Sequence, residues 1–393
     1  MQYRIDNRSG NKLSVLGYGG MRLPGTLNRI DKVKSEALIA KAYEAGINYY
    51  DTAYIYSGSE EALGEIFEKL GIRTKIYIAT KLPHTLCRSK EDFDKYLKEQ
   101  KRRLRTDYID YYLIHNISDY EQWERLCNFG IKDWIAEKKK NGEIHQIGFS
   151  FHGAQKDFFR MLDAYDWDFV QIQYNYININ YQAGAAGLRR AAQMGLPVFI
   201  MEPLLGGKLV NGLPKKAVNL MQEARPGSTP VSWGLGWLWN QPEVTVVLSG
   251  MSEAAQLEEN LKLAEGADPD AFGEPEQQTI QKVIELFNEG DKVRCTGCNY
   301  CMPCPKGINI PASFAAYNTS YNIGWGTGVK HYMIAAGVMG ERPHFAGDCV
   351  GCGKCEKHCP QGIEIRRKLV SVKRRFEFPG TSIAVKVLKK ILR

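Results

Sequence analysis

The sequence predicts an α/β protein made of a closed (β/α)8 TIM barrel and a smaller cysteine-rich domain. From residue 14 to about 265, short runs of β-branched or aromatic residues alternate with helical patterns, and the eight units fit the roughly 250 residues typical of one barrel. Eight of the ten cysteines then fall in two runs near the C-terminus. The 393 residues therefore exceed one ordinary domain and divide into two chemically different parts.

The elements of the barrel can be placed in chain order. Residues 2–12, with the turn Ser9-Gly10-Asn11, are expected to form a hairpin at the bottom of the barrel. Helical patterns such as KSEALIAKAYEAG, SEEALGEIFEKL and EDFDKYLKEQKRRL separate the strands. The expected strands are 14–20, 47–53, 75–82, 108–115, 144–151, 168–175, 197–203 and 244–250. Eight strands alternating with eight helices favour a closed barrel over an open sheet.

The two cysteine runs have the spacing of a ferredoxin-like domain with two [4Fe–4S] clusters. In each run, two residues separate each of the first three cysteines from the next. A fourth cysteine, followed by proline, ligates the other cluster in this pattern. The first predicted ligand set is Cys295, Cys298, Cys301 and Cys359, and the second is Cys349, Cys352, Cys355 and Cys304. Cys304 departs from the usual spacing, because two residues rather than three separate it from Cys301. The pattern indicates a chain that can hold and pass single electrons.

Structural zinc and disulfides are the alternatives for these cysteines. Zinc usually takes two separated C-x2-C pairs, which two triplets with a trailing Cys-Pro do not match. Disulfides need an oxidising compartment, and the N-terminus shows no signal-peptide pattern. Cys87 and Cys127 stand alone and are expected to be packing residues.

The expected domain boundaries are 1–265 for the barrel, 266–290 for a linker and helix, 291–365 for the ferredoxin-like domain and 366–393 for a basic tail. The linker GADPDAFGEP is rich in Gly, Pro and Asp, and a helix at 276–289 follows it. Between the cysteine runs lie 44 residues rich in Gly and aromatics, 305–348. A minimal ferredoxin does not need them, so they could pack over the barrel mouth.

The net charge of +8 comes almost entirely from the C-terminal tail. Residues 366–393 hold ten Lys or Arg and one acid, which gives +9 and leaves the rest of the chain close to neutral. The tail ends SIAVKVLKKILR, the pattern of a short cationic amphipathic helix. It could pack on the body, dock an acidic redox partner or make a peripheral contact with an anionic membrane. Nucleic acid is not expected as a partner, because no recognisable nucleic-acid module accompanies the charge.

Four polar side chains are expected at the C-terminal ends of successive barrel strands, where active sites of such barrels lie. They are Asp51, Tyr56, Lys81 and His115. A lysine cation beside a tyrosine should lower the pKa of the phenol, and an aspartate should keep that lysine charged. A histidine can orient a carbonyl oxygen. Together they could protonate a developing alkoxide.

The segments YDTAYIYSGSEEALG, IYIATKL and DYYLIH resemble the aldo-keto reductases, over roughly residues 1–265. With the cysteine runs, the whole chain resembles the subgroup of that family fused to a two-cluster ferredoxin domain. The resemblance implies that Asp51, Tyr56, Lys81 and His115 are the catalytic tetrad. It also implies that a nicotinamide cofactor lies across the barrel top.

The implied NAD(P)H site can be named residue by residue. It comprises Ser150 and Gln171 at the carboxamide, Gly20 and Met21 beside the ribose, Pro203, Leu204 and Gly206 at the pyrophosphate, and Ser249, Gly250, Gln256 and Asn260 at the adenosine end. Two positions depart from the family pattern. Met201 replaces the aromatic ring that often stacks on nicotinamide, and Gly250 and Gln256 stand where cations hold the 2′-phosphate of NADP. NADH, a loosely held nicotinamide and no nicotinamide all stay open.

The function predicted from these features is an oxidoreductase that reduces a carbonyl or related unsaturated group of a small molecule, with Tyr56 as general acid. A bound FMN is a further hypothesis, because a hydride carries two electrons and each cluster passes one. The expected redox partner is ferredoxin or flavodoxin, in a cytoplasmic setting. Tyr54, Tyr176, Tyr181 and His152 are candidates for lining the mouth. The alternative function is a non-catalytic electron-transfer subunit that uses the barrel as a scaffold.

Overall fold

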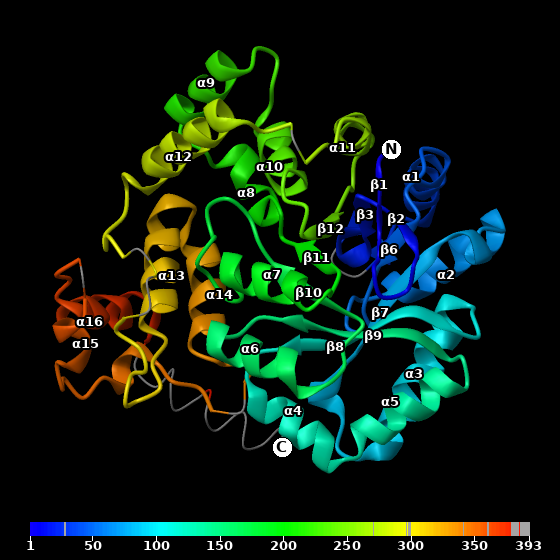
Figure 1. The fold of residues 1–393 in the computed structure, drawn as a ribbon, viewed down its shortest axis with the longest axis horizontal. Coiled ribbons are helices and arrows are strands. Elements are labelled where there is room, and N and C mark those ends of the chain that lie inside the picture. Colours follow the sequence, from blue (N-terminus) through cyan, green and yellow to red (C-terminus); the bar gives the residue numbers. More distant parts are fainter. Residues whose placement is uncertain are drawn as a thin grey trace.

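The computed structural model describes residues 1–26, 29–269, 271–295, 297, 300–340, 342–359, 361–378 and 385. Within them, eight parallel strands close into a barrel in the order β10-β11-β12-β3-β6-β7-β8-β9 (Figure 1). The barrel strands are β3 (Leu16–Gly19), β6 (Tyr49–Asp51), β7 (Tyr77–Leu82), β8 (Ile109–Ile117), β9 (Ile144–Phe151), β10 (Phe169–Gln173), β11 (Val198–Met201) and β12 (Val244–Ser249). Seven strands fall within their expected ranges and β8 ends two residues later than expected, so the predicted (β/α)8 barrel is confirmed.

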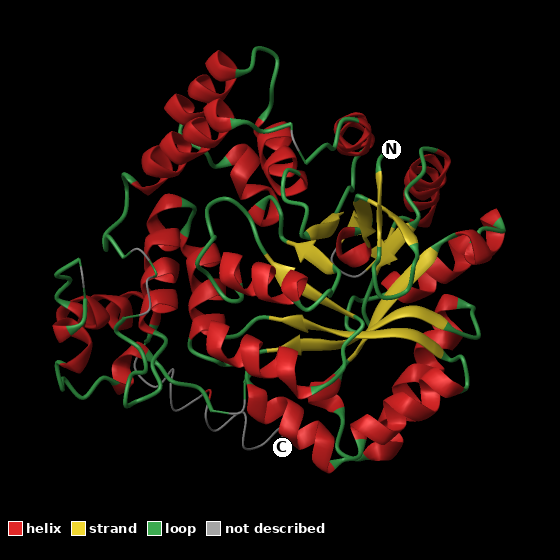
Figure 2. Cartoon of the chain, in the orientation of Figure 1, coloured by secondary structure: helices red, strands yellow, loops and turns green. Residues whose placement is uncertain are grey.

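Helices surround the barrel strands, as Figure 2 shows. They are α1 (Lys32–Glu44), α2 (Ser59–Leu70), α3 (Lys90–Leu104), α4 (Tyr120–Asn128), α5 (Ile131–Lys140), α6 (Gln155–Ala164), α7 (Gly184–Gln193), α8 (Lys208–Asn211), α9 (Lys215–Ala224), α10 (Pro230–Trp239) and α11 (Ala254–Glu265). The short elements between them are η1 (Gly20–Arg22), β4 (Gly25–Thr26), β5 (Arg29–Ile30), η2 (Arg73–Lys75), η3 (His84–Leu86) and η4 (Leu205–Gly207). Local signals fix the helix starts: Asp31 caps α1 by accepting from the Lys34 amide, and Thr229 opens α10 with a capping box.

The barrel interior is a packed core below a polar top. The buried residues Leu13, Tyr49, Ala79, Tyr111, Leu113, Phe169, Phe199, Val246 and Leu248 form one apolar cluster inside it. Because side chains alternate along a strand, the next inward positions on β6, β7, β8 and β10 are Asp51, Lys81, His115 and Gln171. The fold therefore aims polar side chains at one end of a filled barrel.

An N-terminal hairpin closes the other end of the barrel, as predicted. Its strands are β1 (Tyr3–Ile5) and β2 (Lys12–Ser14), which pair antiparallel. The Tyr111 hydroxyl, near the start of β8, donates to Asp6 Oδ2 at 2.7 Å. The hairpin is thereby attached to the bottom of the barrel, opposite the polar end.

The segment expected to be a linker is packed against the barrel. It leads into α12 (Glu274–Asn288), which overlaps the predicted helix at 276–289. Phe272, Ile280 and Phe287 share one apolar cluster with Trp233 of α10. The helix is thus a further layer on the barrel wall.

The C-terminal part has its own small apolar core. Its helices are α13 (Ile310–Asn322), α14 (Trp325–Ala335), α15 (Lys354–Lys357) and α16 (Ile365–Phe376), with a short turn η5 (Ala346–Asp348). Phe314, Tyr332, Phe345 and Leu369 are buried in this core, and described cysteines of both runs pack against it. The amphipathic pattern at residues 384–393 lies almost wholly outside the described residues.

The segment between the cysteine runs does reach the barrel mouth. Lys330 of α14 makes an ion pair of 2.6 Å with Glu202, which directly follows β11. The Gln122 side chain at the start of α4 donates to the Met339 backbone oxygen. Within the described part of the chain, no helix combines the length and the apolar composition that crossing a membrane requires.

Candidate functional site

The four residues of the predicted tetrad meet at the C-terminal end of the barrel strands. Lys81 Nζ lies 2.6 Å from Asp51 Oδ1 and donates to the Thr52 backbone oxygen at 2.7 Å. It also interacts with the Tyr56 hydroxyl, and it lies 5.1 Å from the centre of the Tyr56 ring. The His115 ring stands nearly perpendicular to that ring, with 5.8 Å between their centres. The structure thus brings all four side chains into one cluster.

Lys81 is held as a cation between a carboxylate and a phenol. Burial alone would lower its pKa, but the Asp51 carboxylate and Tyr56 outweigh this effect, so the pKa of Lys81 is raised. The side chains of Lys81 and Asp51 are only 1% and 6% exposed, so water screens their attraction little. Gln171 supports the pair by donating to Asp51 Oδ2 at 3.3 Å.

The pKa of Tyr56 differs from the expectation drawn from the sequence. Burial raises the pKa of Tyr56 above its ordinary value, and the positive charge of Lys81 opposes this only in part. Lys81 does lower the pKa of Tyr56 as expected, but the predicted net direction of the pKa shift is wrong. The sequence did not show how deeply the phenol is enclosed. Tyr56 is therefore a protonated hydroxyl at neutral pH.

His115 is a neutral imidazole in this setting. Burial, followed by the nearby charge of Lys81, lowers the pKa of His115 well below its ordinary value. A neutral imidazole can donate one N–H to an oxygen without competing with Tyr56 as an acid.

Ser150 and Gln171, predicted to hold the carboxamide of a nicotinamide, are direct neighbours. They are register partners on β9 and β10, and both point into the barrel top beside Asp51. Ser150 Oγ accepts from the Asn116 amide at 2.7 Å, which leaves its hydroxyl proton free to donate. Gln171 Oε1 is buried without a partner in the described structure. An acceptor in need of a donor, beside a hydroxyl, fits a primary amide.

The other residues predicted around the cofactor follow the same rim. Gly20 and Met21 lie in η1, and Leu204 and Gly206 lie at η4 after Pro203. Ser249 ends β12, Gly250 follows it, and Gln256 and Asn260 lie on α11. Asn260 donates to Ser249 Oγ at 2.9 Å. Gln256 is already used, because its side-chain oxygen accepts from the Ser252 and Glu253 amides and caps α11. It is therefore not arranged as a phosphate ligand.

Arg22 is a cation on this rim that the sequence argument missed. A Cβ added to Gly206 would meet an Arg22 guanidinium nitrogen at 2.9 Å, and one added to Gly250 would meet Arg22 Cβ at 3.5 Å. Gly206 also has φ +65°, which favours glycine. Arg22 thus lies beside Gly250 and Gly206, the positions predicted for the adenosine end and the pyrophosphate. Its signal was available in the sequence, directly after Met21, but only the contact with Gly206 gives it a role.

A second polar cluster, contributed partly by the C-terminal helices, lies beside the tetrad. His331 of α14 stacks on Tyr181 with ring centres 5.6 Å apart, and Lys330 pairs with Glu202. His152 follows β9, and burial lowers its pKa to about 4, against the attraction of Glu202. His152 and Tyr181 are thus part of this cluster, and their lining of the mouth stays a prediction.

Tyr54 and Tyr176, the other two aromatic candidates, serve mainly as packing. Tyr54 packs on Tyr96 and Arg103 behind the site. Tyr176 is buried in the cluster around Trp233. Neither tyrosine is placed as a lining residue by these contacts.

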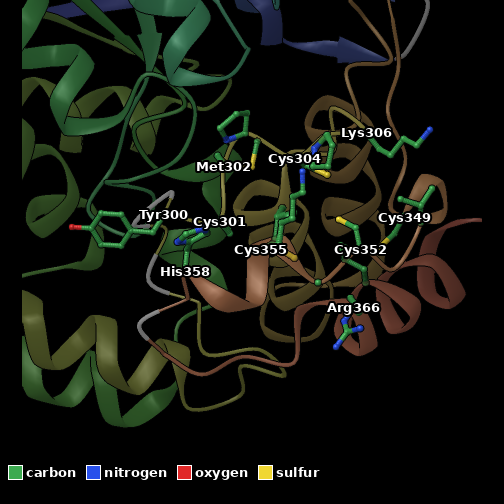
Figure 3. A pocket seen from close by; sticks show the side chains of 17 residues that line it. Tyr300, Cys301, Met302, Cys304, Lys306, Cys349, Cys352, Cys355, His358 and Arg366 are labelled. Atoms are coloured by element: carbon green, nitrogen blue, oxygen red, sulfur yellow. The ribbon is translucent and has the colours of Figure 1, made fainter.

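The second predicted cluster set surrounds one cavity. Cys304, Cys349, Cys352 and Cys355 all line a cavity of about 170 Å³, and Figure 3 shows their side chains gathered around it. All nine cysteines in the described residues are free thiols. Cys301 lines it as well, so five thiols surround this space, and a cubane cluster needs four thiolate ligands. Cys304 belongs to this group despite its unusual spacing.

The first set includes Cys301, which lines the same cavity as the second set. Cys295, Cys301 and Cys359 are half-buried against the C-terminal apolar core, and Cys298 lies outside the described residues. A Cβ added to Gly297, in the loop of the first run, would lie 3.0 Å from Cβ of Asn180 in the loop after β10. The first run therefore contacts the barrel mouth directly.

Comparison with known families agrees with both halves of the chain. The model of the aldo/keto reductase family matches residues 15–270. The chain belongs to the aldo/keto reductase family. A second model, of the 4Fe–4S dicluster domain, matches residues 294–364. The predicted fusion of a reductase barrel with a two-cluster iron–sulfur domain is thereby confirmed, and the chain is an oxidoreductase of this family.

Characterised relatives and solved structures cover most of the barrel. L-glyceraldehyde 3-phosphate reductase of Escherichia coli O157:H7 is 24% identical over 309 residues, covering 67% of this chain and 87% of that protein. L-galactose dehydrogenase of Arabidopsis thaliana is 25% identical, covering 73% and 94%. The holo form of an aldo-keto reductase from Bacillus halodurans has a TM-score of 0.60 and 25% identity, covering 72% of this chain and 96% of that one.

Proposed function

We propose that this protein reduces a carbonyl, or a related unsaturated group, of a small molecule, with Tyr56 as the general acid. The observation that carries the proposal is the position of Lys81, within hydrogen-bonding reach of both Asp51 and Tyr56 at the barrel mouth. A barrel that only scaffolds the clusters has no need of a buried ion pair aimed at a phenol. Retaining such a pair costs desolvation energy that a packed apolar core would avoid.

The residues divide the proton chemistry between them. Tyr56 gives its proton to the substrate oxygen as negative charge develops there, and the Lys81 ammonium stabilises the resulting phenolate. Asp51 keeps Lys81 charged through the cycle. His115 donates its N–H to the same oxygen and so fixes the orientation of the substrate carbonyl. Burial makes each interaction stronger than it would be in water.

Nicotinamide is the cofactor that the barrel residues fit. Members of this family commonly use NAD(P)H, which supplies a hydride when bound. Gln171 and Ser150 would hold its carboxamide, and Arg22 with the loop at Gly206 would hold its phosphates. The FMN hypothesis finds no support in either family model.

The cluster cysteines would connect this site to a one-electron carrier. Cys304, Cys349, Cys352 and Cys355 would hold one [4Fe–4S] cluster, and Cys295, Cys298, Cys301 and Cys359 the other. Ferredoxin or flavodoxin is the expected class of carrier. The potentials of such clusters extend low enough to reduce a nicotinamide or a carbonyl.

An anaerobic titration tests whether the two halves work together. The iron-loaded protein is titrated with NADH and with NADPH while the visible absorbance of the clusters is followed. Bleaching by either nucleotide supports the proposal and identifies the nucleotide. L-glyceraldehyde 3-phosphate, the substrate named for a relative, is a reasonable first carbonyl probe. If neither nucleotides nor reduced ferredoxin support reduction of any carbonyl in a broad panel, the non-catalytic alternative is favoured.

The Arg22→Gln substitution is expected to weaken nicotinamide binding. Losing a charge-assisted contact to phosphate should raise Kd for NADH or NADPH by about 10- to 100-fold. Isothermal titration calorimetry under argon measures this without turnover. Arg29→Gln is the matched control, because Arg29 is an exposed arginine on β5, near the same loop. An unchanged Kd in Arg22→Gln would remove Arg22 from the cofactor site.

The Cys352→Ser substitution is expected to remove one cluster and leave the other. Iron content should fall from about eight to about four atoms per chain, because each cubane holds four irons. Chemical iron analysis and low-temperature EPR of the reduced protein provide the measurement. Cys127→Ser is the control, since Cys127 lies on α4 among the barrel helices. Full iron content in Cys352→Ser would contradict the assigned ligand set.

A further inference from the structure

The cavity of the second cysteine set has an open, positively charged rim. Lys306, Lys354, His358 and Arg366 all line it, and none of the described residues that line it is Asp or Glu. Figure 3 shows Lys306 and Arg366 on opposite sides of the cysteines. Positive charge therefore surrounds the place where a cluster would sit.

Two of these cations are available to a partner. Arg366 is already paired with Glu356 at 2.7 Å, which holds α15 against α16. Lys306 and Lys354 are exposed and make no ion pair within the described part of the chain. A surface that keeps such lysines beside an electron-transfer group attracts anionic proteins and speeds their encounter.

Apolar side chains complete the contact surface. Tyr300 and Val350 line the same cavity and are 67% and 61% exposed, and Cys352 itself is exposed. Electron transfer falls steeply with distance, so a cluster ligand at the surface marks a place where electrons can enter. A small apolar centre ringed by charge is typical of transient protein contacts.

The opposite end of the iron–sulfur part faces the barrel. The loop of the first cysteine run packs on Asn180, next to Tyr181 and Gln182 at the barrel mouth. Figure 1 places α15 and α16 on the far side of α13 from the barrel. The first cysteine run thus reaches from the barrel mouth, at Gly297, to the cavity of the second set, at Cys301.

We propose that the rim formed by Lys306, Lys354, Tyr300 and Val350, the cationic rim, docks a small acidic one-electron carrier. Electrons would enter at the cluster of Cys304, Cys349, Cys352 and Cys355, and would reach the barrel through the cluster of the first run. This inference rests on the proposed function, because the carbonyl substrate in the barrel is the final acceptor of the electrons. Two reduced carriers and two protons convert one carbonyl to one alcohol, and two oxidised carriers leave.

Charge reversal on the cationic rim tests the docking step without any substrate. The double variant Lys306→Glu/Lys354→Glu is mixed with a reduced acidic ferredoxin in a stopped-flow instrument, and bleaching of its clusters is followed. We expect the second-order rate constant to fall at least about tenfold at low ionic strength, and its salt dependence to flatten. Reduction by dithionite should be unchanged, which shows that both clusters are intact.

The matched control is Lys215→Glu/Lys216→Glu, the same charge change at two exposed lysines on α9. Its rate with ferredoxin should stay within about twofold of the native protein. An equal fall in both variants would show that net charge alone matters and would overturn the docking site. The rim variant could instead keep the native rate with ferredoxin and lose binding to anionic lipid vesicles. That result would overturn the docking site for a carrier in favour of a membrane surface.

The order of the clusters has its own test. In Cys352→Ser, the remaining cluster should still be reduced by dithionite, but its reduction by ferredoxin should slow by at least about tenfold. Equal ferredoxin rates in Cys352→Ser and the native protein would show that electrons enter elsewhere. These readouts do not involve a carbonyl, so docking can hold even if the proposed reductase activity fails.

Discussion

Replacing Tyr56 by phenylalanine is expected to reduce turnover by about 10²- to 10⁴-fold, the usual contribution of a positioned general acid. The ring keeps its contact with His115, and only the hydroxyl that Lys81 binds is lost. Both clusters should stay intact, because Tyr56 belongs to the barrel and not to the cysteine domain. Steady-state kinetics measures the effect on kcat, and visible absorbance checks the clusters.

Tyr54→Phe is the matched control for this experiment. Tyr54 lies two residues away and packs on Tyr96, with no contact to Lys81 among its described interactions. Its removal should change kcat by less than about threefold. Native turnover in Tyr56→Phe would show that another group donates the proton, and the tetrad assignment would then be wrong.

The barrel could be predicted because each of its features is local in the sequence. Strand and helix periodicities alternate over short windows, and the ends of parallel strands must meet at one rim. Asp51, Lys81 and His115 each end or nearly end one strand, so their proximity follows from topology alone. Tyr56 reaches them from the loop before α2.

The electrostatics and the distant contacts could not be predicted in the same way. Spacing shows that Lys81 lies near Tyr56, but the net pKa of Tyr56 depends on how much water the surrounding loops exclude. Glu202 and Lys330 are 128 positions apart, and no local pattern pairs them. The contact between Arg22 and Gly206 could not be predicted from a local pattern either, because it depends on the absence of a side chain at Gly206.

Replacing Lys81 by methionine is expected to damage stability as well as activity. The substitution leaves Asp51 buried without its cation, and removing one partner of a buried pair costs about 3–5 kcal/mol. For a domain of this size that lowers the barrel Tm by on the order of 10 °C. Turnover should fall at least as far as in Tyr56→Phe, since Lys81 also stabilises the phenolate. Calorimetry under argon and kinetics at low temperature separate the two effects.

Two further variants make this result specific to the buried pair. Lys81→Met combined with Asp51→Asn removes both charges, so it should recover most of the lost Tm but none of the turnover. Lys69→Met removes an exposed lysine that pairs with Glu36 at 2.7 Å, and it should cost less than about 1 kcal/mol. If Lys81→Met lowers the Tm no more than Lys69→Met does, Asp51 must accept a proton or a water molecule in place of Lys81. The ion pair is then not what organises the site. If the double variant instead regains turnover, Tyr56 donates its proton without help from a cation, and the role of Lys81 is limited to folding.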